Sequence, residues 1–219
     1  MAEILIAPSI LSADFAAMGE AVKNLEKWNA DWVHCDVMDG EFVPNITFGM
    51  PMVEALDRNT GLFLDVHLMI VKPERYVERF VKAGADLVTF HPEASEDAFG
   101  TIEKIKSAGA KAGIVLNPDI PCEVAEKFVD KVDVIMLMGV FPGFGGQKFI
   151  PEVMDKISVL KEMTKGKDVL VELDGGVTLE NAPEMVRRGL DVMVAGNAVF
   201  KAADPCKAIA CLRTGRTSL

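Results

Sequence analysis

The fold is decided by one stretch, Val33-His34-Cys35-Asp36-Val37-Met38-Asp39-Gly40, which has the composition of a buried strand that runs into a loop. Successive side chains of a strand point to opposite faces, so we expect His34 and Asp36 to project on the same side. An imidazole and a carboxylate that leave a strand end together can serve as two metal ligands, or as one ligand and one catalytic base. Cys35 points the other way and is expected to be a buried apolar residue.

Two later stretches place polar residues at apolar strand ends in the same way, Asp65-Val66-His67 and Glu172-Leu173-Asp174. We therefore expect four side chains to converge on one divalent metal ion: His34, Asp36, His67 and Asp174. Two imidazoles and two carboxylates suit Zn²⁺, Fe²⁺, Mn²⁺ or Co²⁺ better than Mg²⁺, which prefers oxygen and water. The residues alone leave an alternative open, because short patterns of this kind also occur as buried structural hydrogen-bonding pairs.

Short apolar runs alternate with amphipathic stretches along the whole chain, which predicts a parallel sheet with helical crossovers. Eight such units in 219 residues favour one closed (β/α)8 TIM barrel, which we expect to cover residues 1–213 and to be followed by a tail at 214–219. An open, doubly wound sheet would usually carry a GxGxxG turn after its first strand, whereas this chain has Ser9-Ile10-Leu11-Ser12 there. Strands are expected at 4–9, 31–36, 62–67, 85–91, 112–117, 132–138, 169–174 and 190–195. Helices are expected at 15–28, 51–56, 73–83, 97–108, 123–129, 153–164, 179–188 and 205–212, with a short turn at 198–202.

Composition limits the classes of partner. Half of the residues are hydrophobic and the net charge is −10, so the chain suits one well-buried domain and disfavours nucleic acid or an anionic membrane as a partner. The four cysteines include no CxxC pair, and the first residues lack the basic flank and apolar run of a signal peptide. We therefore expect reduced thiols and a cytoplasmic location. No apolar run approaches the roughly 20 residues of a membrane-spanning helix.

Polar residues gather at the carboxyl ends of the expected strands, where a barrel carries its active site. All three histidines of the chain, including His91, fall there. Glycine-bearing loops follow the sixth, seventh and eighth strands, at residues 142–147, Gly175-Gly176 and Gly196-Asn197. Backbone N–H groups in such loops commonly bind a phosphate group in barrels, although each loop alone could be an ordinary tight turn.

The two carboxylates of the expected cluster suggest a reaction. Asp36 and Asp174 come from the second and seventh strands and can approach a substrate from opposite sides. A metal ion between them could hold a carbonyl and an adjacent hydroxyl of a substrate, act as a Lewis acid and stabilise an enediolate. One carboxylate would remove a proton from carbon and the other would return one to the opposite face, which is a 1,1-proton transfer that inverts a stereocentre.

Several longer strings carry a resemblance. Residues 7–14 (APSILSAD), 34–45 (HCDVMDGEFVPN), 65–69 (DVHLM), 142–149 (PGFGGQKF) and 174–177 (DGGV) together resemble the ribulose-phosphate 3-epimerase family, in order along nearly the whole chain. The resemblance implies a ribulose-phosphate-binding type of (β/α)8 barrel, one divalent ion that is most often Zn²⁺, and a phosphorylated ketose as substrate. It also implies interconversion of D-ribulose 5-phosphate and D-xylulose 5-phosphate in the pentose phosphate pathway, by a homo-oligomer such as a dimer or hexamer.

Carried across by position, the resemblance assigns His34, Asp36, His67 and Asp174 as metal ligands. Asp36 would be the proton acceptor and Asp174 the proton donor, with roles exchanged in reverse. The substrate contacts that it implies are Ser9, His67, Met38, Met69, Met138, Gly143, Phe144, Gly145, Gly146, Gly175, Gly176, Gly196 and Asn197. By composition alone, the methionines would be core residues, as is expected for Met136.

Three positions depart from the family pattern. Asn197 replaces a usual serine, Gly139 a serine or threonine, and Phe141 a polar residue. The departures spare the metal ligands and affect the phosphate loops, so D-allulose-6-phosphate 3-epimerase activity is an alternative. A non-catalytic barrel that binds a phosphorylated metabolite is a second alternative. A barrel decarboxylase is disfavoured because its DxKxxD motif is absent at Asp36.

Two further carboxylates lie two residues before ligands, so Asp65 and Glu172 should face the barrel interior one layer deeper. We expect them to orient metal ligands, with a buried structural hydrogen bond as the alternative role.

Overall fold

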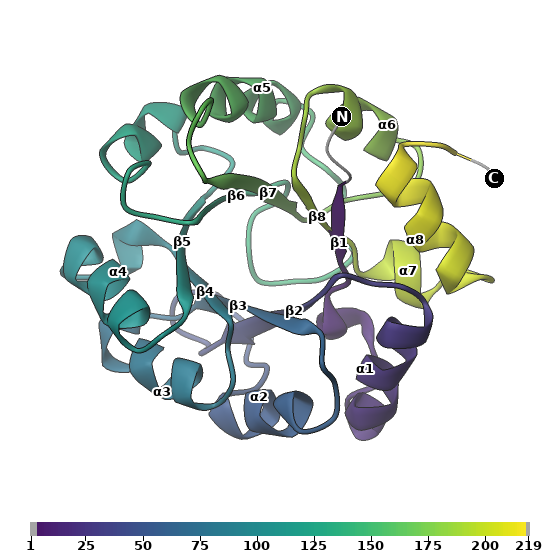
Figure 1. Cartoon of the computed structure of the whole chain (residues 1–219), viewed down its shortest axis with the longest axis horizontal. Coiled ribbons are helices and arrows are strands. Elements are labelled where there is room, and N and C mark those ends of the chain that lie inside the picture. The colour runs from purple at the N-terminus through teal and green to yellow at the C-terminus, as the bar shows by residue number, and fades with distance from the viewer. Residues whose placement is uncertain (1–3, 218–219) are drawn as a thin grey trace.

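A computed structural model describes residues 4–217 and contains one eight-stranded parallel sheet that forms a (β/α)8 barrel (Figure 1). The strands are hydrogen-bonded in the order β1-β8-β7-β6-β5-β4-β3-β2, and the His34 N–H donates to Pro8 O across the β1–β2 seam at 3.1 Å. The single TIM barrel predicted from the sequence is confirmed. The strands are β1 Leu5–Ala7, β2 Trp32–Met38, β3 Phe63–Met69, β4 Leu87–Phe90, β5 Lys111–Leu116, β6 Val134–Met138, β7 Leu170–Asp174 and β8 Val192–Val194.

The helices form a ring around the strands (Figure 1). None of the helices within residues 4–217 is long and apolar enough to cross a membrane. The α-helices are α1 Met18–Lys27, α2 Met50–Asp57, α3 Val77–Lys82, α4 Ala98–Ser107, α5 Val153–Met163, α6 Ala182–Arg187, α7 Asn197–Phe200 and α8 Pro205–Thr214. The 3₁₀ helices are η1 Ile10–Ser12, η2 Phe15–Ala17, η3 Pro73–Arg75, η4 Pro92–Ala94 and η5 Cys122–Lys127.

Buried apolar residues form one large cluster and three smaller ones in the described part of the chain. The larger core lies between the strands and the helices and includes Cys35, which is fully buried as predicted. A smaller cluster includes Trp32, Leu87 and Val192, which are the first residues of β2, β4 and β8. Towards the strand ends the buried residues include charged and imidazole side chains, and this polar part of the interior underlies the site.

An aspartate lies immediately before each even-numbered strand. Its carboxylate accepts a hydrogen bond from the N–H of the second residue of the preceding odd-numbered strand, which ties the strands together in pairs. The four bonds are Ile6 N to Asp31 (2.7 Å), Leu64 N to Asp86 (2.8 Å), Ala112 N to Asp133 (2.8 Å) and Val171 N to Asp191 (2.7 Å).

Some element boundaries differ from the predictions. β2 and β3 each continue two residues beyond the predicted ends because they pair in register as far as Met38 and Met69. The helix predicted at 123–129 is the 3₁₀ helix η5, and the turn at 198–202 is the single-turn helix α7. The predicted tail at 214–219 was wrong at its start, because Thr214 belongs to α8 and its hydroxyl donates to Ala210 O at 2.9 Å. Residues 218 and 219 of that tail lie outside the described part of the chain.

Candidate active site

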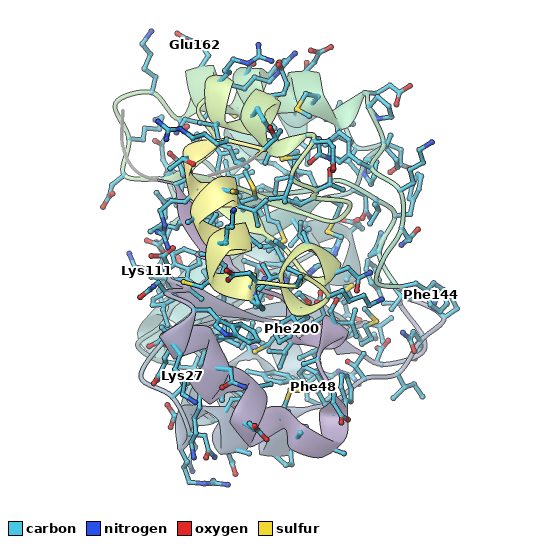
Figure 2. All side chains as sticks on the ribbon, turned by 90° about the vertical axis from the view of Figure 1, so that its right-hand side faces the viewer. Lys27, Phe48, Lys111, Phe144, Glu162 and Phe200 are labelled. Carbon is cyan, nitrogen blue, oxygen red and sulfur yellow. The ribbon has the colours of Figure 1, made fainter. Side chains whose placement is uncertain are left out.

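A pocket of about 490 Å³ opens at the carboxyl ends of the strands. Figure 2 shows that Phe144, which comes from the loop after β6 and lines the pocket, and Lys111 at the start of β5 lie on opposite sides of the molecule. The loop after β6 reaches across the opening, since the Asn45 amide donates to Gly143 O at 2.9 Å and an added Cβ on Gly145 would lie 3.6 Å from Leu11.

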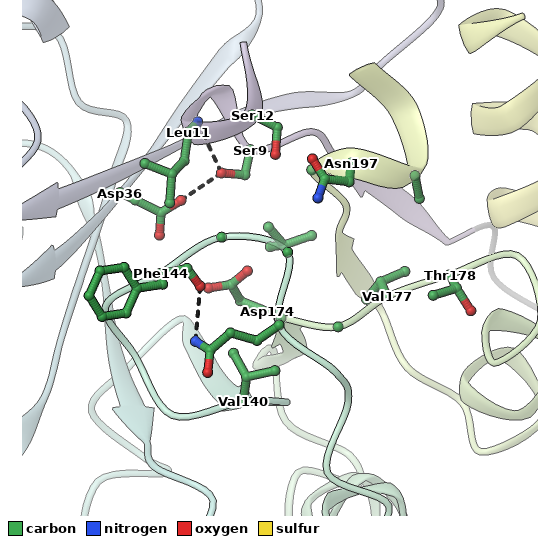
Figure 3. A pocket seen from close by; sticks show the side chains of 18 of the residues that line it. Ser9, Leu11, Ser12, Asp36, Val140, Phe144, Asp174, Val177, Thr178 and Asn197 are labelled. Atoms are coloured by element: carbon green, nitrogen blue, oxygen red, sulfur yellow. Dashed lines mark hydrogen bonds between the residues drawn. The ribbon is translucent and has the colours of Figure 1, made fainter. Parts of the chain in front are cut away.

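Four side chains at the base of this pocket bring one ligand atom each to within 4.8 Å of one another: His34, Asp36, His67 and Asp174. The Asp36 Oδ1 atom lies 3.4 Å from His34 Nε2 and 3.5 Å from His67 Nδ1. The Asp174 Oδ2 atom lies 3.9 Å and 3.8 Å from the same nitrogens. Figure 3 shows the Asp36 and Asp174 carboxylates within one pocket. The cluster predicted from the sequence is thus assembled by β2, β3 and β7.

The two imidazole nitrogens in this cluster, His34 Nε2 and His67 Nδ1, are buried and have no hydrogen-bond partner. Buried polar atoms are rarely left without one, and each such atom lowers stability by about 1–3 kcal/mol. Both nitrogens face two carboxylates, and this donor set is the kind that binds a divalent transition ion. The residues therefore fit a metal ion.

Two carboxyl groups lie one layer deeper, as predicted. Asp65 Oδ2 pairs with His34 Nδ1, so the imidazole has its Nδ1 edge fixed and its Nε2 edge towards the cluster. Glu172 Oε1 lies 3.9 Å from the same nitrogen. Burial, and then the negative charge of Asp65, raise the pKa of Glu172 well above its ordinary range, so this side chain is held as a neutral acid.

The pKa values of the cluster are shifted in opposite directions. Burial lowers the pKa of His34, but the negative charges of Asp65 and Asp36 outweigh it and raise that pKa well above its usual range. Burial acts to raise the pKa of Asp36, yet the charge and hydrogen bonding of His34 outweigh it and lower that pKa. Burial, and then the charge of Asp36, raise the pKa of Asp174 to about 7. Burial lowers the pKa of His67. Near neutral pH, Asp36 is ionised while Asp174 is half protonated.

Ser9 has a contact that the sequence did not predict. Its hydroxyl donates to Asp36 Oδ2 at 2.6 Å and accepts a longer bond from the Leu11 N–H at 3.3 Å (Figure 3). The residue also lines the pocket. A buried hydroxyl in this position fixes the orientation of the carboxylate while leaving its other oxygen towards the cluster.

His91 is completely buried and lies beside the cluster. Its Nε2 atom is 3.0 Å from His67 Nε2, and its ring lies 4.8 Å from the ring of Phe42 between centroids. Burial lowers the pKa of His91 to about 4, so the ring is neutral at physiological pH. The sequence placed His91 among the strand-end residues but gave no indication of this contact.

The glycine loops predicted to bind phosphate all line one part of the pocket. Gly176 has a φ of +68°, and an added Cβ would lie 2.6 Å from the backbone of Phe149, so a side chain does not fit there. Lys201 is the one basic side chain among the described lining residues. Sequence reasoning missed this lysine, together with Leu11, Ser12, Gln147 and Thr178, because these residues approach the pocket only through the folded loops.

The loop after β6 is held by the side chain of Gln147, which belongs to the loop, as well as by Asn45. The Gln147 amide donates to Phe141 O at 2.7 Å and to Phe144 O at 2.9 Å. Both phenylalanine side chains are more than half exposed. Gly139 allows a close approach at the start of the loop, because a Cβ there would lie 2.2 Å from Gly175 O. A side chain at position 139 would therefore displace the backbone next to Asp174.

The predicted site residues fall into two layers. His34 and His67 are fully buried beneath the pocket, and the other predicted residues line it. Met136 is fully buried in the interior, as predicted, and does not line the pocket. The predicted residues in the lining are Ser9, Asp36, Met38, Met69, Met138, Gly143, Phe144, Gly145, Gly146, Asp174, Gly175, Gly176, Gly196 and Asn197.

Comparison with solved structures supports the fold. The chain superposes on 3-hexulose-6-phosphate synthase with a TM-score of 0.70 and 19% identity, covering 98% of this chain and 100% of that one. It superposes on KGPDC from Streptococcus mutans with a TM-score of 0.73 and 13% identity, covering 98% and 97%. At these identities the likeness concerns the barrel alone.

Comparison of sequences is more specific. The profile of the ribulose-phosphate 3 epimerase family matches residues 5–200. The chain is 53% identical over 213 residues to ribulose-phosphate 3-epimerase of Bacillus subtilis, covering 96% of this chain and 98% of that protein. It is 51% identical over 211 residues to the chloroplastic ribulose-5-phosphate-3-epimerase of Arabidopsis thaliana, covering 94% of this chain and 75% of that protein. With the profile match and these identities over nearly its whole length, the chain belongs to the ribulose-phosphate 3-epimerase family.

Proposed function

We propose that the protein interconverts D-ribulose 5-phosphate and D-xylulose 5-phosphate by inverting the configuration at C3. The observation that carries this proposal is the pair Asp36 and Asp174, whose oxygens approach within 4.8 Å and whose pKa values are shifted in opposite directions. Inversion by proton transfer needs one group that accepts a proton and another that donates one, and groups with separated pKa values suit these roles.

His34, Asp36, His67 and Asp174 would hold one divalent ion, for which we propose Zn²⁺, with Fe²⁺, Mn²⁺ and Co²⁺ as further candidates. The ion supplies positive charge that stabilises the negative charge developing on the substrate oxygens when a carbon-bound proton is lost. Asp65 fixes the orientation of the His34 ring from below, which supports its role as a ligand.

In the direction from D-ribulose 5-phosphate, Asp36 removes the proton from C3. In the substrate complex, Asp174 carries a proton on the carboxyl oxygen that does not bind the ion and gives it to the opposite face of the same carbon, and the two residues exchange roles in the reverse direction. The Ser9 hydroxyl holds the Asp36 carboxylate in place through its 2.6 Å hydrogen bond. After one turnover the two carboxyl groups have exchanged protonation states, and solvent exchange restores them.

The rest of the pocket would position the substrate. The glycine loops and Lys201 lie together and would receive the phosphate group through backbone N–H groups and one positive charge. Met38, Met69 and Met138 would form an apolar surface next to the reacting carbons and exclude water from it. The loop after β6, held by Asn45 and Gln147, would cover the bound substrate.

A proton NMR time course in D₂O tests this proposal, with metal-replete protein and D-ribulose 5-phosphate. We expect loss of the C3 proton signal together with growth of D-xylulose 5-phosphate. Absence of both would reject this substrate, and the same measurement with D-allulose 6-phosphate would then test the six-carbon alternative. Tight binding of either compound without exchange would favour a non-catalytic barrel.

Self-association into a dimer or hexamer and a cytoplasmic location belong to the same proposal. Sedimentation velocity of the purified protein tests the first, with a single species of the monomer mass as the contradicting result. Fractionation of cells that produce the protein tests the second.

A further inference from the structure

We propose that His91 is a positioning residue, which holds His67 in the tautomer whose Nδ1 lone pair is free to bind the metal ion beside Asp36 and Asp174. Glu93 and Asn117 in turn hold His91. The inference rests on the metal site proposed above, and it assigns a role to three residues outside the ligand set.

The argument begins with the shared contact of two imidazoles. The Nε2 atoms of His67 and His91 are 3.0 Å apart, which is a hydrogen-bond distance, and both rings are completely buried. One nitrogen must donate and the other must accept, because two N–H groups or two lone pairs at this distance would repel each other. The contact therefore couples the tautomers of the two rings.

The other edge of His67 determines which nitrogen donates. His67 Nδ1 lies 3.5 Å from Asp36 Oδ1 and 3.8 Å from Asp174 Oδ2, and it has no hydrogen-bond partner. A nitrogen that binds a metal ion must be unprotonated. The proton of a neutral His67 then resides on Nε2, which donates to His91 Nε2, and His91 must carry its own proton on Nδ1.

The surroundings of His91 match that assignment. Its Nδ1 atom has no hydrogen bond in this structure, and the carboxylate oxygen Glu93 Oε1 lies 3.5 Å from it, an acceptor that also receives a 2.8 Å hydrogen bond from the Asn117 amide. The ring packs against Phe42 on one side and against the His67 ring on the other. The cluster, His67, His91 and the carboxylate of Glu93 thus lie in sequence, with a hydrogen-bond distance between the two imidazoles and a 3.5 Å separation at Glu93.

The backbone also fixes the positions of His91 and Glu93 relative to each other. His91 directly precedes η4, and its carbonyl accepts the Ala94 N–H at 3.0 Å. Glu93 lies within that same 3₁₀ turn, so the spacing between the imidazole and the carboxylate is set locally. His34 is held on its outer edge by Asp65, so both predicted imidazole ligands would be oriented by a carboxylate, directly for His34 and through His91 for His67. Such supporting groups commonly alter metal affinity by about 10- to 100-fold when removed.

The direct test is the tautomeric state of each ring, read from the ¹⁵N chemical shifts and two-bond couplings of the histidines in the full-length protein with and without Zn²⁺. We expect His67 to carry its proton on Nε2 and His91 on Nδ1 in the Zn²⁺-loaded protein. A proton on His91 Nε2 in that sample would overturn the proposal. A protein that binds no Zn²⁺ would instead overturn the proposed metal site, so the two failures are distinguishable.

A matched pair of variants tests the consequence. The amide oxygen of His91→Gln can accept the His67 N–H, whereas His91→Leu has similar bulk and no acceptor. We expect Zn²⁺ affinity, measured by competition with a chromophoric chelator, to fall about 10- to 100-fold for His91→Leu and less than about threefold for His91→Gln. Equal losses in both variants, or no loss in His91→Leu, would overturn the proposal.

Thermal unfolding of each metal-free variant separates positioning from folding. If His91→Leu does not fold, Glu93→Ala replaces it, because that side chain is 41% exposed and its removal leaves the core intact. We expect Glu93→Ala to weaken Zn²⁺ binding by a few fold with an unchanged unfolding temperature. Unchanged affinity in Glu93→Ala would contradict the role assigned to Glu93.

Discussion

Zn²⁺ binding to the metal-stripped protein should strengthen as the pH rises, with a slope that changes near the Asp174 pKa of about 7. Metal ligands must lose their protons before they coordinate, so each ligand that carries a proton makes the affinity depend on pH. Two of the four proposed ligands carry one near neutrality. The pKa of His34 is raised well above its usual range, and that of Asp174 is raised to about 7.

The slope follows from these shifts. Asp36 and His67 have lowered pKa values and contribute no proton near pH 7. Between about pH 7 and the raised pKa of His34, one proton leaves on binding, so affinity should rise about tenfold per pH unit. Below about pH 7, Asp174 is also protonated, two protons leave, and affinity should fall about 100-fold for each unit that the pH is lowered.

The assay is chelator competition at constant ionic strength from about pH 5.5 to about pH 8.5, with calorimetry in two buffers of different ionisation enthalpy to count the protons released. Asp174→Asn is the matched control, because it removes one titrating group and keeps the size of the side chain. We expect that variant to show the one-proton slope throughout. Affinity that is independent of pH, or the same break near pH 7 in Asp174→Asn, would refute the reasoning.

Three further predictions concern other parts of the molecule. Asp65→Asn and Glu172→Gln should each weaken Zn²⁺ binding by about 10- to 100-fold in the competition assay, and unchanged affinity would show that these carboxyl groups are only structural. Asp191→Ala should lower the free energy of unfolding by about 2–3 kcal/mol in urea, because a buried N–H and a lysine lose their partner. The exposed control Asp130→Ala should lower the free energy of unfolding by less than about 1 kcal/mol. If both variants lost the same free energy of unfolding, the aspartates before the even-numbered strands would not have the stabilising role described here. Lys201→Ala should raise KM for the phosphorylated substrate about three- to tenfold with little change in kcat, and an unchanged KM in steady-state assays would exclude a phosphate contact.

The sequence predicts the barrel well because parallel strands are continuous apolar runs and their carboxyl ends meet on one face. That rule brought His34, Asp36, His67 and Asp174 together from three separate strands, and the structure places them within 4.8 Å. Alternation along β3 and β7 also placed Asp65 and Glu172 correctly below this cluster of four side chains.

Other features depend on contacts between distant segments and leave no local pattern. The hydrogen bond from Ser9 to Asp36 crosses the β1–β2 seam, and the pairing of His67 with His91 depends on the turn of η4. Lys201 lines the pocket and directly follows the single-turn helix α7, a position that no local sequence pattern indicates. The aspartate before each even-numbered strand is visible in the sequence, but its partner on the preceding strand is not.

The most direct test of the two-carboxylate mechanism is proton exchange at C3 in D₂O, measured by NMR for Asp174→Asn and Asp36→Asn with each epimer. With D-ribulose 5-phosphate, Asp174→Asn should still exchange the C3 proton through Asp36, while D-xylulose 5-phosphate forms at least about 100-fold more slowly than in the wild-type protein. Asp36→Asn should show the same behaviour starting from D-xylulose 5-phosphate. Exchange of the same epimer by both variants, or epimerisation at the wild-type rate in either one, would contradict proton transfer by two opposed carboxylates.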